Sequence, residues 1–107
     1  MFLNNNLWTI FEVAREERTD GDADTGDLGS AADRFVNCLE SEGQAYRCMD
    51  GLDKPALLAE WTALGAEKQV DEMNAYEKMV DGHYTELCRS FTAGDREAFE
   101  AVVAGRA

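Results

Sequence analysis

Apolar residues recur every three or four positions between residues 67 and 91, and this period constrains the fold more than any other feature. At 100° per residue, the apolar side chains of this segment fall within a sector of about 120°. They are Val70, Met73, Tyr76, Val80, Tyr84, Leu87, Cys88 and Phe91. The stripe predicts one amphipathic helix from residue 67 to residue 91, with Gly82 as a weak point in its interior.

The N-terminal quarter of the chain has a shorter stripe with the same period. Its apolar residues stand at positions i, i+3, i+4 and i+7, namely Leu7, Ile10, Phe11 and Ala14. This spacing predicts a helix from about residue 5 to residue 18, with Asn4, Asn5 or Asn6 as its cap. Residues 8–13 also fit a short strand, because β-branched and aromatic residues cluster there.

Capping signals predict the remaining helices. Ser30 and Asp33 have the spacing of a capping box, which indicates a helix that starts at Ser30, breaks or kinks near residues 41–43 and resumes to about Met49. Asp53 stands before Pro55 and predicts the start of a further helix, which should stop or bend at Gly65. Asp95 should cap a short last helix that buries Phe99, Val102 and Val103.

These segments together predict an all-α fold, a small helical bundle of four to six helices with one long acidic loop. The length of 107 residues is typical of a single domain, here residues 1–107, and allows a core without metal or disulfide support. The loop comprises residues 19–29 and contains Asp20, Asp22, Asp24 and Asp27 without any Lys or Arg. The like charges of such a run repel one another, so we expect this loop to be mobile.

The charge of the whole chain excludes two classes of partner. Asp and Glu number 22 against 10 Lys and Arg, so the net charge is −12. Proteins that contact phosphates directly need clustered bases, and here the bases are scattered among acids, so we expect neither direct nucleic-acid binding nor membrane binding. No basic, apolar leader is recognisable, and we expect a cytoplasmic protein (in the host cytoplasm if phage-encoded) with reduced cysteines.

No group of residues has the spacing that metal binding or catalysis requires. Asp20, Asp22 and Asp24 resemble the start of an EF-hand loop, but Thr25 and Ala31 stand where the motif needs Gly and Glu. The three cysteines and His83 lack zinc-knuckle spacing. Neighbouring acids, such as the pairs Glu16–Glu17 and Asp71–Glu72, point about 100° apart on a helix and are typical of solvated faces. We therefore expect no catalytic residues, no metal ligands and no cofactor.

Size and acidity favour a non-enzymatic protein-binding module. We expect an inhibitor, of the phage anti-CRISPR or DNA-mimic kind, that docks on a basic, nucleic-acid-binding surface of a partner protein. The carboxylates expected to bind the partner are Glu16, Glu17, Asp20, Asp22, Asp24, Asp27 and Asp33. One alternative is a helical assembly module, such as a homodimer formed through residues 67–91, an antitoxin-like protein or a virion accessory. A second alternative is a weak divalent-metal site in the acidic loop.

Overall fold

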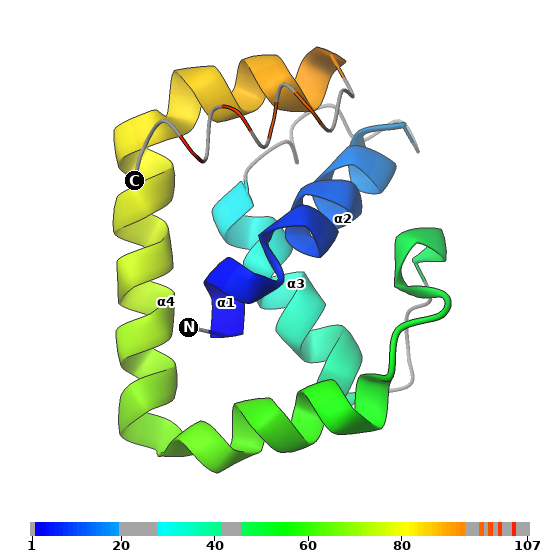
Figure 1. Ribbon diagram of the computed structural model, residues 1–107, viewed down its shortest axis with the longest axis vertical. Coiled ribbons are helices and arrows are strands. Elements are labelled where there is room, and N and C mark those ends of the chain that lie inside the picture. Colours follow the sequence, from blue (N-terminus) through cyan, green and yellow to red (C-terminus); the bar gives the residue numbers. More distant parts are fainter. Residues whose placement is uncertain are drawn as a thin grey trace.

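The computed structural model describes residues 2–19, 28–41 and 46–93, together with residues 97, 99, 101 and 104. Within these residues the regular structure is entirely helical, which confirms the predicted all-α class. The chain forms α1 (Phe2–Asn5), α2 (Leu7–Thr19), α3 (Leu28–Glu40), the 3₁₀ turn η2 (Arg47–Met49) and α4 (Lys54–Ala93). Figure 1 shows α4 running along three sides of the molecule, with α1, α2 and α3 inside it.

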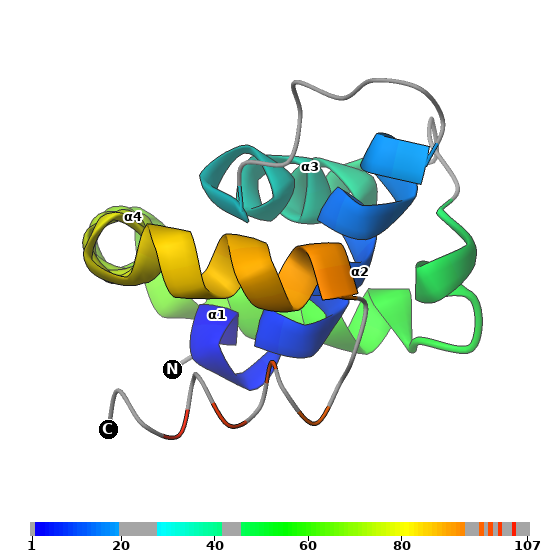
Figure 2. The same ribbon diagram turned by 90° about the horizontal axis from the view of Figure 1, so that it is seen from above.

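Two bends divide α4 into a first arm (54–64), a middle arm (66–82) and a third arm (84–93). The bends lie at Gly65, with φ 82° and ψ 159°, and at His83, with φ −123° and ψ 17°. Gly65 suits the first bend because side chains rarely tolerate its positive φ. The side-chain amide of Gln69 donates a hydrogen bond of 2.9 Å to the carbonyl oxygen of Trp61 and so supports this corner. Seen from above, the third arm is nearest to the viewer and passes in front of α2 (Figure 2).

Aromatic side chains from distant parts of the chain form the two ends of the core. Under the third arm, Phe99 packs against Phe11 with ring centroids 4.2 Å apart, and Trp8 stacks on Phe11 at 5.0 Å. Beside the first arm, Phe2 contacts Trp61 at 5.2 Å and also Phe35. Because Phe2 and Phe99 are both buried, residues close to each end of the chain contribute to one core.

The buried carboxylate of Glu72 ties α1 to the middle arm. Its Oε2 accepts a hydrogen bond of 3.2 Å from the backbone N–H of Leu3, near the start of α1. Glu72 is buried, so its prediction as part of a solvated face is wrong. A carboxylate near the first turn of a helix also interacts favourably with the free N–H groups there, which accounts for its place in the core.

Several predicted elements are confirmed. The helix predicted from about residue 5 to residue 18 is present as α2 (Leu7–Thr19), so the strand alternative for residues 8–13 is wrong. The side chain of Asp53 caps α4 by accepting a hydrogen bond of 3.1 Å from the N–H of Ala56. Gly65 bends the chain as predicted, and Trp61 is buried while its neighbours Leu57 and Leu64 are half-buried.

Other predicted boundaries are wrong. Helix α3 starts at Leu28, so Ser30 lies inside the first turn and does not precede the helix as its cap. After Glu40 the predicted continuation to Met49 is only the short turn η2, and residues 42–45 lie outside the described part of the chain. The last predicted helix is described only in part: Phe99 is buried as expected, while Asp95, Val102 and Val103 are not described.

The long helix predicted from residue 67 to residue 91 is wrong in its continuity, because it bends at His83. Of its predicted apolar stripe, Tyr76, Val80 and Leu87 are buried, whereas Val70 is 58% exposed and Tyr84 is 50% exposed. Val70 lies at the edge of the stripe, and the bend precedes Tyr84. The predicted apolar stripe is therefore wider than the face of the helix that is buried against the core.

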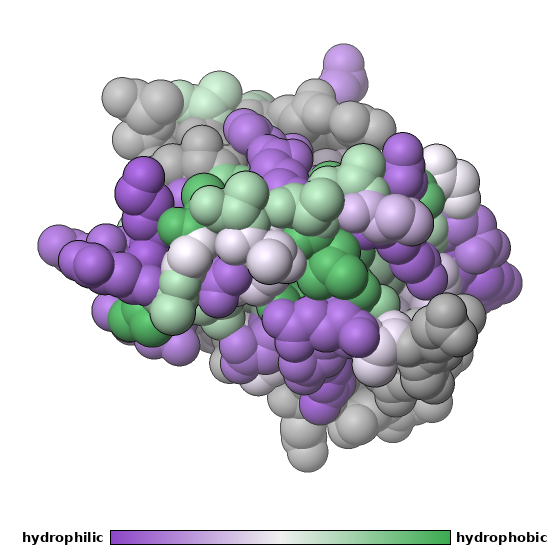
Figure 3. Space-filling model, turned by 90° about the horizontal axis from the view of Figure 1, so that it is seen from below, coloured by the Kyte–Doolittle hydropathy of each residue, from purple (hydrophilic) through white to green (hydrophobic). Residues whose placement is uncertain are grey.

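The outer face of the first arm carries little charge. Its exposed positions include Ala56, Ala59 and Ala63, with Glu60 as an exposed acid beside them. Figure 3 views the molecule from the side of this arm, where white and pale green residues are bordered by purple ones.

Candidate functional site

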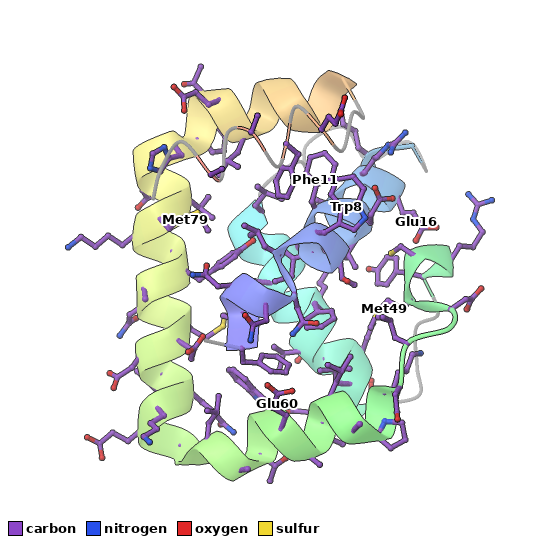
Figure 4. All side chains as sticks on the ribbon, viewed as in Figure 1. Trp8, Phe11, Glu16, Met49, Glu60 and Met79 are labelled. Atoms are coloured by element: carbon purple, nitrogen blue, oxygen red, sulfur yellow. The ribbon has the colours of Figure 1, made fainter. Side chains whose placement is uncertain are left out.

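Glu16 and Glu17 are neighbours near the end of α2, but they bind different parts of the fold. Adjacent residues of a helix point about 100° apart. One oxygen of Glu16 accepts hydrogen bonds from the backbone N–H of Arg47 at 3.1 Å and from its Nε at 3.2 Å. The other oxygen accepts the thiol hydrogen of Cys48 at 3.4 Å. Glu16 thereby joins α2 to η2, and Figure 4 shows it beside that turn.

Glu17 is buried, which contradicts its prediction as part of a solvated face. Only 7% of the residue is exposed, and its Oε1 accepts a hydrogen bond of 2.7 Å from the hydroxyl of Tyr46. The same oxygen forms an ion pair with the guanidinium of Arg34 on α3. Burial, followed by the hydrogen bond to Glu17 and the charge of its carboxylate, raises the pKa of Tyr46 to about 12. Glu17 thus connects α2, α3 and the residue before η2.

A cavity of about 490 Å³ next to η2 contains a thiol but no activated nucleophile. It is lined by Glu12, Arg15, Glu16, Arg47 and Cys48. Burial and the neighbouring carboxylate of Glu16 raise the pKa of Cys48 to about 12. Because the thiolate is the reactive form, this thiol is unreactive at neutral pH. Burial likewise raises the pKa of Cys38.

The strongest candidate site is a groove between the start of α3 and the middle arm of α4, which we call the acidic groove. Its volume is about 220 Å³. It is lined by Gly29, Ser30, Asp33, Glu77, Val80 and Asp81. Gly29 and Ser30 are small, which leaves space between the helices, and the buried Val80 provides an apolar contact. Glu77 and Asp81 are four residues apart and share one face of the middle arm.

The carboxylates of the acidic groove have no partner in the described part of the chain. Asp33, Glu77 and Asp81 are all exposed, and none of them forms an ion pair or a hydrogen bond with another described residue. Like charges four residues apart destabilise a helix by about 0.2–0.5 kcal/mol. The groove therefore concentrates negative charge that no described residue neutralises, in contrast to Glu16 and Glu17.

The predicted partner-binding residues are thus divided among three places. Asp33 lies in the acidic groove. Glu16 and Glu17 instead bind other residues of the fold. The four acids of the loop lie outside the described residues, namely Asp20, Asp22, Asp24 and Asp27. Glu77 and Asp81 were not among the predicted partner-binding residues. Their spacing of four residues could have identified them, because it puts both acids on one face of a helix. Lys78 does not share that face, since it points about 100° away from Glu77.

Within the described residues, no group of three or more His, Cys, Asp or Glu side chains could hold a metal ion. None of the described helices combines the length and the hydropathy that crossing a bilayer requires. Comparison of the chain with protein-family models, with curated proteins and with solved structures gave no match.

Proposed function

We propose that the chain is a non-enzymatic, acidic protein-binding module of the cytoplasm. It acts as an inhibitor, of the anti-CRISPR or DNA-mimic kind, by docking on a basic, nucleic-acid-binding surface of a partner protein. The observation that supports this proposal is the acidic groove, where Asp33, Glu77 and Asp81 lie together and no cation of the described residues pairs with them. Glu16 and Glu17 play no part in it because both bind within the fold.

The proposed mechanism is the replacement of phosphate by carboxylate. A Lys or Arg of the partner that would otherwise bind a nucleic-acid phosphate instead enters the acidic groove and forms charge-assisted hydrogen bonds with Asp33, Glu77 or Asp81. Binding also relieves the repulsion between these acids. Attraction between exposed charges is screened by salt, with a Debye length of about 10 Å at 0.1 M and about 3 Å at 1 M, so the complex should weaken steeply as salt rises.

Capture of basic proteins at low and high salt tests the proposal. The native chain should retain nucleic-acid-binding proteins at low salt and release them at high salt, and the variant D33N/E77Q/D81N should retain far less. A matched control, E40Q/D50N/E60Q, removes the same charge from exposed acids outside the groove and should behave like the native chain. Recovery of no basic partner at low salt would refute the proposal.

The two alternatives stay predictions. A homodimer through residues 67–91 is tested by light scattering, where a monomer at high concentration counts against it. A weak metal site in the acidic loop is tested by calorimetric titration with Ca²⁺. Substitution of Asp20, Asp22, Asp24 and Asp27 by Asn would show in the same capture experiment whether the loop contributes to partner binding.

A further inference from the structure

Two large hydrophobic side chains are exposed close to the acidic groove. Val70 is 58% exposed and Tyr84 is 50% exposed, and both belong to α4. Val70 precedes Glu77 by seven residues, and Tyr84 follows Asp81 by three. By sequence position, the groove residues of α4 therefore lie between the two hydrophobic side chains.

The geometry of the middle arm places Val70 on the same stripe as the acids of the groove. At 100° per residue, Val70, Glu77 and Asp81 fall within about 40° of one another. A rise of 1.5 Å per residue puts Val70 about 10 Å before Glu77 along the helix axis. Tyr84 begins the third arm directly after the bend at His83, about one helical turn beyond Asp81. Val70 and the two acids thus face the same side of α4.

Charge and hydrophobicity together restrict what could cover this face. An acidic segment would be repelled by Asp33, Glu77 and Asp81, which pair with no cation in the part of the chain that the structure describes. A purely basic segment would neutralise the groove but leave Val70 and Tyr84 in water. Tyrosine is enriched among residues that contribute most to protein interfaces, and burial of apolar area adds affinity that salt does not screen.

Building on the proposed function, we infer that the segment recognised in the partner is amphipathic. One Lys or Arg side chain enters the acidic groove, while apolar side chains before and after it cover Val70 and Tyr84. A helical segment of about 15 residues has the length to contact both side chains, which are 14 residues apart along α4. The acids steer and orient this segment, and the apolar contacts hold it at salt concentrations that screen the charges.

Two synthetic peptides of equal positive charge test this inference. One combines Arg with Leu in a helical pattern, and the other has Ser in place of each Leu. The native chain should bind the Arg/Leu peptide at least about tenfold more tightly, which corresponds to about 1.4 kcal/mol. The variant V70S/Y84S should lose this preference, whereas V70I/Y84F, which keeps both positions hydrophobic, should retain it. The unfolding midpoint of each variant verifies that the fold persists.

The outcomes separate this inference from the function on which it rests. If both peptides bind equally and V70S/Y84S changes nothing, while D33N/E77Q/D81N abolishes binding, the function stands and the amphipathic partner is wrong. If neither peptide binds, docking of basic segments is wrong and this inference fails with it. Binding of the Arg/Leu peptide that neither V70S/Y84S nor D33N/E77Q/D81N weakens would place the contact elsewhere and overturn the inference.

Discussion

Glu17 and Asp33 carry the same charge on neighbouring helices, yet the fold uses them in opposite ways. Glu17 is buried against Arg34 and Tyr46, where a charge is tolerated only with hydrogen-bonded partners. Asp33 is exposed in the acidic groove and has no partner among the described residues. At the scale of single residues, burial and pairing therefore distinguish carboxylates that stabilise the fold from those that are available to a partner.

Neutralising Glu17 should destabilise the fold. The substitution Glu17→Gln removes the charge that pairs with Arg34, and we expect a loss of about 2 kcal/mol in the free energy of unfolding, measured with urea. Glu12→Gln is the control, because Glu12 pairs with Arg15 three residues away in a partly exposed ion pair. This control should change stability by less than about 0.5 kcal/mol. Equal effects of the two substitutions would contradict the internal role of Glu17.

Tyr46 should ionise at an unusually high pH. Its pKa in the folded chain is about 12 against an ordinary value of 10.0, so the folded state holds the phenolic proton more tightly than the unfolded chain. The stability that this provides is complete below pH 10 and is lost as the pH rises through 12. Ultraviolet titration of the phenolate, with Tyr46→Phe as the subtracted control, measures this pKa. A value near 10 for Tyr46 would refute the buried hydrogen bond to Glu17.

At the scale of elements, the bends of α4 were only partly predictable. Gly65 marks its bend in the sequence, since glycine is the residue that tolerates a positive φ. His83 carries no such signal, because its bend depends on where the core lies: the third arm turns so that Leu87 is buried. Helical periodicity indicates which residues share a face of a helix, but the position of the core decides how much of that face is covered.

The two glycines of α4 form a matched pair for mutation. Gly65→Ala places a side chain at φ 82° and should destabilise the chain by about 1–3 kcal/mol, although nothing lies within 4 Å of the added Cβ. Gly82 has helical backbone angles and equally open surroundings, so Gly82→Ala should stabilise it by about 0.5–1 kcal/mol. Thermal unfolding measures both changes, and effects of the same sign would contradict the assigned backbone of α4.

At the scale of the whole molecule, the sequence indicated part of the site but not its assembly. Asp33 was identified because it stands near the acidic loop in the sequence. Glu77 and Asp81 were missed because they are 44 and 48 residues beyond Asp33, and only the packing of α3 against α4 brings the three together. Glu16 and Glu17 were assigned to the site because sequence proximity cannot reveal that Arg34, Tyr46 and Arg47 bind them.

Repulsion among the acids of the acidic groove should limit the stability of the free chain. Removing the acids of the groove relieves their mutual repulsion, so D33N/E77Q/D81N should unfold at a higher urea concentration than the native chain, with a gain of about 0.5 kcal/mol at low salt. Added salt should reduce this gain, since it screens the same repulsion. A variant less stable than the native chain would indicate that these carboxylates have stabilising partners.

The most direct test of the central claim is the affinity of the chain for the Arg/Leu peptide before and after neutralisation of the acidic groove. We predict that D33N/E77Q/D81N lowers the affinity at least about tenfold at low salt, while E40Q/D50N/E60Q, with the same net charge, changes it by less than about twofold. Equal weakening by the two variants would contradict the claim, because the net charge of −12 alone, and not the groove, would then attract the partner.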